Sequence, residues 1–350
     1  MIGRRGFVGA SAAIASGARA ADPLKIGWVY VGPVGDFGWS YQHDQGRRAV
    51  EAALGGAVKT SFVEKVPEGP DAERVIRQLA SSGHGLIFTT SFGFMNPAER
   101  VARQFPNVRF EQATGYKTLP NLAEYNGRFY EGRAVCGTMA GMLSKAGVAG
   151  YVGSVPIPEV VMGINAFTLA ARKVNPDFKT KVIWVNAWFD PGREADAAKS
   201  LIDQGADILC QHTDSPAVMQ TAQERRVLAF GQASDMGRFG PDAQVTAIVD
   251  DWGPYYIERA KAALDGSWRT QSVWMGMREG LVELAAYGPS VTSEVERAAN
   301  AVKAGIMGGT LHPFSGPIRD QKGVARVAAG SAMADADLLK MDWYVEGVQA

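Results

Sequence analysis

Aromatic and carboxyl side chains follow several of the apolar segments of this 350-residue chain. Asp36 and Trp39 come after one such segment, and Trp188 and Asp190 come after another. An indole ring can stack on a flat heterocycle, and a carboxylate can accept hydrogen bonds from its N–H groups. If the segments are parallel strands, their carboxyl ends meet at one sheet edge, where open α/β sheets bind ligands. The pattern favours a flat polar ligand over a lipid or a metal ion.

The sequence gives no positive indication of catalysis. Its four histidines lack metal-ligand spacing. The loop from Gly32 to Gly38 reads G-x-x-G-x-x-G, which is neither a dinucleotide fingerprint nor a P-loop, and no G-x-S-x-G elbow is present. His212 and Asp214 lie close together, but no nucleophile accompanies them, so capping of a helix at Ser215 is the simpler interpretation. We expect no metal, no cofactor and no enzymatic activity.

Short apolar segments alternate with helical patterns along most of the chain. Strands are predicted at 24–31, 58–64, 86–90, 108–113, 148–153, 181–186, 206–210, 227–230 and 245–249. Helices are predicted at 39–54, 71–81, 97–104, 131–145, 160–174, 194–204, 215–224 and 255–264. This alternation is typical of βαβ units and parallel sheets. The same pattern predicts two successive α/β halves, with a crossover between them near 119–126. Further strands are predicted within 272–284.

Composition limits the possible partners. Thirty-six basic and 36 acidic residues balance, so no overall charge attracts the chain to nucleic acid or anionic lipid. No apolar run reaches the ~20 residues that a membrane span needs. Two isolated cysteines, Cys136 and Cys210, are more typical of small buried residues than of a disulfide, although pairing stays open.

The first twenty residues are typical of an export signal. Arg4 and Arg5 precede a weakly apolar stretch, and Ala18-Arg19-Ala20 fits a cleavage site. The arginine pair before Gly6 predicts the twin-arginine route. We therefore expect a soluble, monomeric, periplasmic product. A helix of the mature protein is the alternative interpretation of this stretch.

The run from Gly35 to Tyr41, followed by Gly46, resembles the first ligand loop of the basic membrane protein family. Members of that family are substrate-binding proteins of ABC importers for purine nucleosides and related compounds. Supporting segments occur in consistent order at 129–132, 188–195, 231–235 and 343–348. The resemblance implies an α/β type I periplasmic-binding fold, with two doubly wound parallel-sheet lobes joined by a three-strand hinge. It also implies a permease partner in the inner membrane.

The same resemblance implies a lobe division and a set of ligand-binding residues. The N-terminal lobe is expected at 21–122 plus about 249–270, the C-terminal lobe at 123–248 plus about 271–310, and an extension packing on the lobes at 311–350. Trp39 and Trp188 fall where the family clamps a purine between two rings. The other candidate ligand-binding residues are Asp36, Phe37, Phe92, Tyr116, Glu159, His212, Gln232, Asp235 and Asp250. A helix cap is the alternative role for Asp36.

Two positions depart from the family pattern. Thr114 stands where nucleoside binders have an Asp, and Asp250 stands where they have a Lys. Both family residues serve ribose hydroxyls, and a carboxylate in place of a lysine reverses a charge. We therefore expect a free purine base, such as adenine, to be preferred over a nucleoside. An exported nucleoside hydrolase and a ligand sensor for a signalling partner are the alternative functions.

Overall fold

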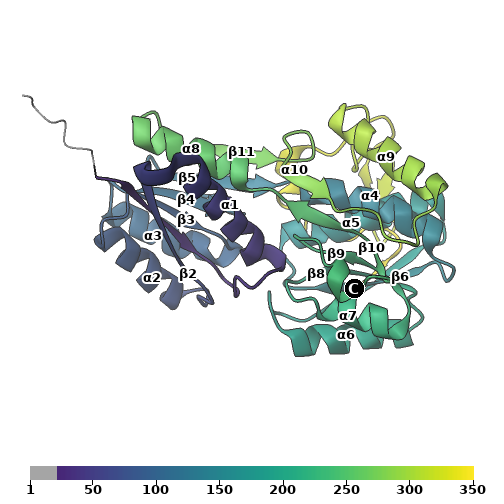
Figure 1. Ribbon diagram of the computed structural model, residues 1–350. Coiled ribbons are helices and arrows are strands. Elements are labelled where there is room, and N and C mark those ends of the chain that lie inside the picture. The colour runs from purple at the N-terminus through teal and green to yellow at the C-terminus, as the bar shows by residue number, and fades with distance from the viewer. Residues whose placement is uncertain (1–21) are drawn as a thin grey trace, which may run out of the picture.

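Two separate sheets form the centres of two lobes. The computed structural model describes residues 22–350, and Figure 1 shows the lobes side by side. The first sheet has the order β2-β1-β3-β4-β5-β11, with every neighbouring pair parallel. Its strands are β1 (Leu24–Val29), β2 (Val58–Val63), β3 (Leu86–Thr89), β4 (Arg109–Ala113), β5 (Leu122–Gly127) and β11 (Ser272–Met275). The central strand β3 is buried throughout, as a parallel strand covered on both faces must be.

Helices cover both faces of this first sheet. α1 (Gly38–Leu54) packs with α8 (Gly253–Asp265) on one face, and α2 (Pro70–Ser81) packs with α3 (Met95–Gln104) on the other. Figure 1 shows these pairs above and below the strands. α2 and α8 carry a proline in their first turn, where its missing N–H costs no intrahelical bond. The helices therefore start directly after the strand-end loops and hold those loops at one edge of the sheet.

The second lobe repeats this arrangement. Its sheet has the order β12-β10-β9-β8-β6-β7-β15 and is parallel except for β12 at the edge. The strands are β6 (Val148–Gly153), β7 (Lys179–Trp184), β8 (Ile208–His212), β9 (Leu228–Gly231), β10 (Gln244–Asp250), β12 (Val282–Leu284) and β15 (Val348–Gln349). The helices are α4 (Phe129–Leu143), α5 (Pro158–Val174) and α9 (Ser293–Met307) on one face, and α6 (Pro191–Asp203) and α7 (Ala217–Arg225) on the other.

The chain passes between the lobes three times. The crossings follow β5 at Arg128, β10 at Asp251 and β11 at Gly276. Residues 123–127 and 272–275, expected in the second lobe, therefore pair in the first sheet. The expected crossover at 119–126 contains β5 itself. Glu124 and Asn126 interrupt its apolar pattern although every residue of β5 is buried, which explains why the pattern did not indicate a strand.

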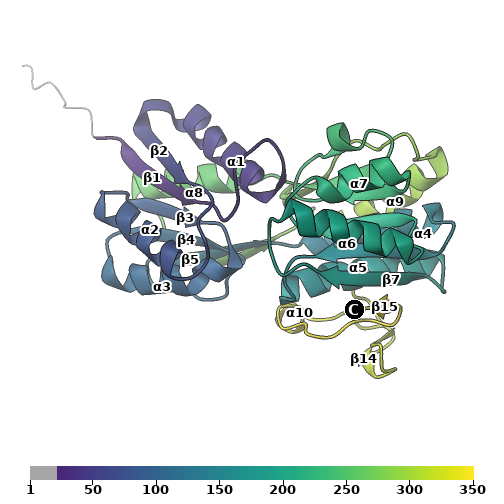
Figure 2. The ribbon, with the colours of Figure 1, turned by 90° about the horizontal axis from the view of Figure 1, so that it is seen from below.

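The last forty residues wrap the second lobe. Figure 2 shows β14 (Ala325–Val327), α10 (Asp335–Leu338) and β15 along one side of it. β14 pairs with β13 (Ile318–Arg319), and β15 adds to the edge strand β7. The amide of Asn165 on α5 clamps this segment: it donates to the carbonyl of Trp343 at 2.8 Å and accepts from the N–H of Val345 at 3.0 Å.

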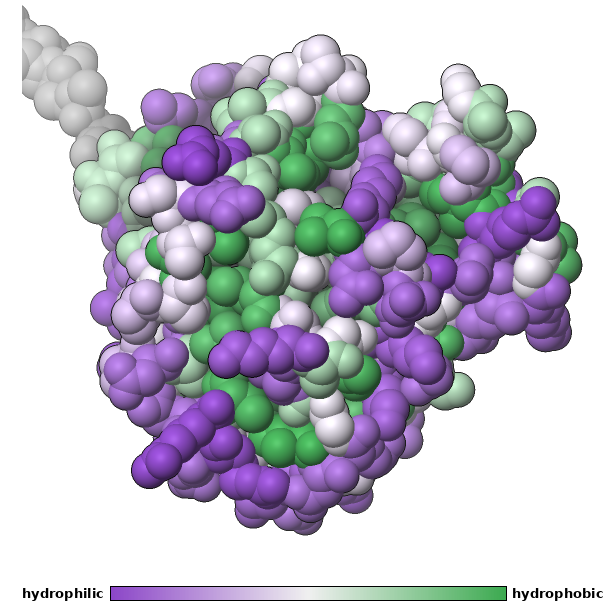
Figure 3. Space-filling model, turned by 90° about the vertical axis from the view of Figure 1, so that its right-hand side faces the viewer, coloured by the Kyte–Doolittle hydropathy of each residue, from purple (hydrophilic) through white to green (hydrophobic). Residues whose placement is uncertain are grey.

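The surface is mixed in polarity. Figure 3 shows the end of the second lobe, where hydrophilic residues lie around and between the hydrophobic ones. Among residues 22–350, no helix combines the length and the apolar character that crossing a membrane requires. The predicted leader at 1–20 lies outside the described residues.

Candidate ligand-binding site

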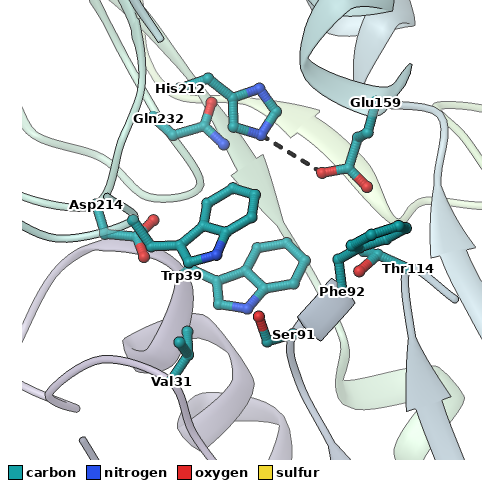
Figure 4. A pocket seen from close by; sticks show the side chains of 10 residues that line it. Val31, Trp39, Ser91, Phe92, Thr114, Glu159, His212, Asp214 and Gln232 are labelled. Atoms are coloured by element: carbon teal, nitrogen blue, oxygen red, sulfur yellow. Dashed lines mark ion pairs between the residues drawn. The ribbon is translucent and has the colours of Figure 1, made fainter. Parts of the chain in front are cut away.

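A narrow slit lies between the lobes at the carboxyl ends of their strands (Figure 4). Its unfilled space amounts to about 340 Å³. The first lobe lines it with Val31, Trp39, Ser91, Phe92 and Thr114, and the second with Glu159, Trp188, His212, Asp214 and Gln232.

Trp39 provides a rigid ring from the first lobe. It lies at the start of α1 and is only 9% exposed. Its indole N–H donates to the carbonyl oxygen of Thr90 at 2.7 Å. Its ring makes edge contacts with His43, Phe129 and Trp252, at centroid distances of 4.4, 5.8 and 5.5 Å. These contacts fix the ring in place, so a ligand that stacks on it does not have to order it.

Trp188 provides the ring from the second lobe, in the loop between β7 and α6. Asp190 caps α6 by accepting from the N–H of Arg193 at 3.0 Å, and Pro191 begins the helix, which fixes the loop that carries the indole. The Trp188 N–H donates to Glu68 Oε1 of the first lobe at 3.1 Å. This hydrogen bond joins the lobes across the slit and is characteristic of a closed conformation.

His212 and Glu159 form a polar corner of the slit. Nε2 of His212 lies 3.4 Å from a carboxylate oxygen of Glu159, as the dashed line in Figure 4 marks. Burial lowers the pKa of His212, while the hydrogen bond to Glu159 opposes that shift. His212 Nδ1 and Glu159 Oε2 are buried without a hydrogen-bond partner among the described residues. Buried polar atoms normally have partners, so both are free to bind a polar ligand.

Gln232 is oriented by a buried arginine. Arg133 on α4 is fully buried and donates to the carbonyl oxygen of Gln211 at 2.7 Å and to the side-chain oxygen of Gln232. Because its oxygen is engaged, the Gln232 amide presents its nitrogen to the slit, as Figure 4 shows. The residue therefore offers a hydrogen-bond donor at a defined place.

Two further carboxyl groups belong to this region. Burial raises the pKa of Asp214, which lines the slit, and the charge of Glu194 adds to that shift. Asp250 ends β10, and both of its carboxyl oxygens are buried without a partner among the described residues. Burial raises its pKa well above the ordinary value, and nearby Glu159 raises it further. Asp214 can accept a hydrogen bond from a ligand N–H in the slit.

Two residues with a strained backbone also lie at the carboxyl ends of the strands, beside the slit. Thr114 after β4 and Ala233 after β9 both adopt a left-handed conformation with φ of 59°. This conformation is unfavourable for a β-branched residue such as threonine, and strained residues cluster at functional sites. Thr114 lines the slit, and Ala233 follows Gln232, which also lines it.

The structure brings together six of the eleven candidate residues. Trp39, Phe92, Glu159, Trp188, His212 and Gln232 line the slit. Tyr116 is 69% exposed and lines an adjoining cavity instead. Asp250 is buried near the slit without being part of its lining.

The remaining three candidates do not line the slit and make contacts with other parts of the protein. Asp36 forms an ion pair with Arg238 of the other lobe. Phe37 packs edge-on against Phe239 at 5.3 Å. Asp235 is exposed and accepts from the N–H of Gly237 at 2.9 Å. Asp36 does not cap α1 either, since Phe37 is the capping residue and makes no side-chain bond.

The capping interpretation of His212 and Asp214 is wrong. Pro216 precedes α7 without a side-chain cap, and Ser215 rather than Asp214 accepts from the N–H of Ala217, at 3.2 Å. Asp214 lines the slit with His212. The sequence did not indicate Val31 or Ser91 as lining residues, and it indicated Thr114 only as a departure from the family's ribose-binding Asp. The available signal was their place at strand ends, because all three occur in or beside loops expected to face the ligand.

The cysteines are free and buried, so the prediction of small core residues is confirmed. Across residues 22–350, no group of three or more His, Cys, Asp and Glu side chains is placed to hold a metal ion.

Comparisons with known proteins agree with this architecture. The model of a family described as ABC transporter substrate-binding proteins, PnrA-like, matches residues 24–311. A Brucella abortus protein named as purine-binding is 58% identical over 331 residues, which cover 95% of this chain and 94% of the relative. A Haloferax volcanii protein named as a candidate glucose-binding protein of an ABC transporter is 39% identical over 329 residues, covering 94% of this chain and 81% of the relative.

Solved structures match the fold. A solute-binding protein of an ABC transporter system from Aeropyrum pernix K1 superimposes with a TM-score of 0.72 at 18% identity, covering 85% of this chain and 93% of that one. One from Conexibacter woesei gives 0.67 at 21% identity, covering 83% and 98%. The predicted fold class and family are confirmed: the chain belongs to the PnrA-like family of ABC transporter substrate-binding proteins.

Proposed function

We propose that this protein captures a purine outside the cytoplasmic membrane and delivers it to the permease of an ABC importer. The observation that carries the proposal is the pair of indole rings, Trp39 and Trp188, which come from different lobes and line one slit. A flat ligand between them is in contact with both lobes at once. It therefore stabilises the closed state, which is the state a permease can distinguish from the empty receptor.

Stacking alone does not account for useful affinity. A base stacked on one aromatic side chain gains about 1–3 kcal/mol, so two faces contribute roughly 2–6 kcal/mol. Micromolar binding requires about 8 kcal/mol. The remainder is assigned to the Gln232 donor and to the Glu159, Asp214 and Asp250 acceptors. A purine carries both N–H donors and ring-nitrogen acceptors, so it complements this mixed set.

The proposal favours a free base, such as adenine, over a nucleoside. Thr114 and Asp250 occupy the two positions at which the family resemblance places ribose-binding Asp and Lys. Asp250 is buried, and its carboxyl group has no protein partner among the described residues. Such a group can accept an N–H of the base, whereas the loss of the lysine removes a donor to the sugar.

Export is the second part of the proposal. The Arg4-Arg5 leader with its Ala18-Arg19-Ala20 site would direct the chain to the periplasm. Expression of the full chain followed by fractionation and N-terminal sequencing tests this. A mature N-terminus near Ala21 in the periplasmic fraction is expected, and an intact leader on cytoplasmic protein would refute export.

The ligand is tested by titration calorimetry on protein freed of bound molecules by unfolding and refolding. Adenine, adenosine and glucose are compared, since one relative is named for glucose. Adenine is expected to bind most tightly, and Trp188→Ala to weaken that binding about ten-fold or more while Trp188→Phe retains most of it. Tighter adenosine binding would reject the base preference, and binding of glucose without either purine would reject the purine proposal. Chromatography of the adenosine mixture tests for hydrolysis.

A further inference from the structure

A second, wider cavity adjoins the slit. Phe92, Thr114 and Glu159 line both spaces, so the two are neighbours at one wall. Its unfilled space amounts to about 1000 Å³, compared with about 340 Å³ for the slit. We call it the side chamber. It is too wide to clamp a planar ring, but it can hold a group that projects from one.

The side chamber is lined mainly by carbon. Ile157 and Met162 contribute from the second lobe, Tyr116 from the first and Leu339 from the C-terminal extension. Tyr116 and Leu339 are 69% and 43% exposed, so they present apolar surface that the protein itself does not bury. The polar groups of the lining belong to Thr114, Tyr116, Asn126, Glu159 and Lys340. The side-chain oxygen of Asn126 is already engaged, since it accepts from the N–H of Gly127 at 2.7 Å. The polar groups are thus a minority of the lining, and most of the chamber wall is apolar.

The C-terminal extension is fixed where it forms this wall. Asp335 at the start of α10 receives two hydrogen bonds from Arg128, at 2.9 and 2.5 Å. Arg128 lies at the first crossing, and its guanidinium stacks on Trp274 at 4.3 Å. Such a two-point ion pair holds its partners in one geometry. Leu339 and Lys340 lie beyond residue 311, where the match to the family model ends, so the extension supplies a wall that the family match does not cover.

We infer that the side chamber binds an apolar substituent carried by the ring that the slit holds. This rests on the proposed function, because it takes a purine in the slit as given. The apolar lining gains free energy when an alkyl or aryl group covers it. The shared residues Phe92, Thr114 and Glu159 place the substituent and the ring within one molecule's reach. The ligand class is thus a purine bearing one apolar side group.

Calorimetry with four ligands tests the inference on the protein freed of bound molecules: adenine, 6-benzylaminopurine, 9-benzyladenine and adenosine. In the two benzyl compounds the benzyl group is attached at opposite edges of the purine. At least one is expected to bind about ten-fold more tightly than adenine, the gain typical of burying a few carbon atoms. Leu339→Asp is expected to abolish that gain and leave adenine binding unchanged. Leu264→Asp, at a similarly exposed leucine on α8, is the matched control.

The outcomes separate the two proposals. Adenine binding with neither benzyl compound bound more tightly would overturn the side chamber and leave the proposed function standing. A benzyl gain that survives Leu339→Asp would also overturn it, because the substituent would then bind elsewhere. Adenosine binding more tightly than both benzyl compounds would show that the chamber takes a sugar. Failure of all four ligands to bind would refute the proposed function itself.

Discussion

At the scale of single residues, the site depends on buried polar groups that hold one another. Arg133 illustrates this: it contacts no solvent, yet it determines which atom Gln232 offers to the slit. A side-chain amide can present either its oxygen or its nitrogen, and here the guanidinium leaves only the nitrogen. Arg133 thus makes Gln232 specific for a hydrogen-bond acceptor on the ligand, although Arg133 itself does not line the slit.

Replacing Gln232 with Glu tests this arrangement. The variant keeps the shape and adds a charge opposite Arg133, so we expect the protein to remain folded. The substitution removes the side-chain N–H that residue 232 directs toward the slit. Adenine affinity should therefore fall about ten-fold, as expected for the loss of one hydrogen bond to a buried group. Calorimetry and thermal unfolding measure the two effects. Unchanged affinity would show that the Gln232 nitrogen does not contact the ligand.

Asp250 predicts a pH dependence of binding. Burial raises its pKa above the ordinary 3.8 in the ligand-free protein. A ligand N–H donated to this group stabilises the carboxylate and lowers the pKa, so binding releases a proton. Affinity should therefore rise with pH between the lower pKa of Asp250 in the complex and its raised pKa in the ligand-free protein. Asp250→Asn should flatten this dependence.

Calorimetry in two buffers with different heats of ionisation detects the proton release directly. The same pKa shift has a consequence for stability: the contribution of Asp250 is fully present below its unfolded pKa and is lost as the pH rises through the folded one. Ligand-free Asp250→Asn should thus be more stable than the parent at neutral pH. Proton uptake on binding would contradict the assignment.

At the scale of elements, the ends of parallel strands bring the site together, and the hinge strands hold the lobes in register. β5 and β11 lie side by side and end at two of the three crossings. Glu124 on β5 is buried there, and its carboxyl group accepts a hydrogen bond from the hydroxyl of Ser272 on β11. Burial raises the pKa of Glu124 to about 7, although the hydrogen bond to Ser272 opposes the shift.

This raised pKa predicts that the first lobe loses stability as the pH increases. The contribution of Glu124 is complete below its unfolded pKa, near 4.5, and disappears as the pH rises through 7. Glu124→Gln should therefore be more stable than the parent at pH 8, by about 3 kcal/mol at most, and should differ little at pH 4. Urea unfolding at the two pH values measures this.

Glu99→Gln provides the control for Glu124. Lys117 and Arg103 lower the pKa of that carboxyl group, so its removal should give no gain at pH 8. If Glu124→Gln gained as much at pH 4 as at pH 8, the effect would not come from the ionisation of Glu124.

At the scale of the whole molecule, the lobes meet through contacts around the slit. The N–H of Gly38 donates to Ser234 Oγ at 2.7 Å, and Trp188 reaches Glu68. Trp39 packs on Phe129 and Trp252, which follow the first two crossings. The ring that stacks on the ligand therefore also contacts the hinge, so ligand binding and lobe closure share one set of residues.

Gly38→Ala should impede closure without unfolding either lobe. A Cβ atom at Gly38 would lie 2.6 Å from the carbonyl oxygen of Asp214 in the other lobe, which is closer than non-bonded atoms approach. Adenine affinity should fall about ten-fold or more, because the ligand then has to bind a receptor that is held open. Small-angle scattering should show less compaction on ligand addition than in the parent.

Gly35→Ala is the matched control, since Gly35 also has a positive φ and a Cβ there would meet nothing closer than the Phe37 ring at 3.9 Å. The strain of an alanine at positive φ is common to both variants. Equal losses in the two would attribute the effect to backbone strain instead of closure.

The sequence by itself determined the succession of strands and helices, the two-lobed fold class and the family. These features arise from local periodicity and from short motifs, such as the run around Trp39 and the Asp190-Pro191 helix start. It also indicated which loops face the ligand, because strand ends are visible in the apolar pattern. It did not reveal α9, although Thr292 caps that helix and Glu294 and Glu296 follow in its first turn.

Only the tertiary structure decided what each polar side chain contacts. Asp36 forms an ion pair with Arg238, about two hundred positions away in the sequence. The carboxyl group that lines the slit is that of Asp214 instead. Arg133 reaches Gln232 from a different element, and the extension reaches the side chamber from the far end of the chain. Such partners meet only after both lobes have folded and closed. The physical reason is that hydrogen bonds and ion pairs depend on distance in space, whereas a sequence pattern reports only distance along the chain.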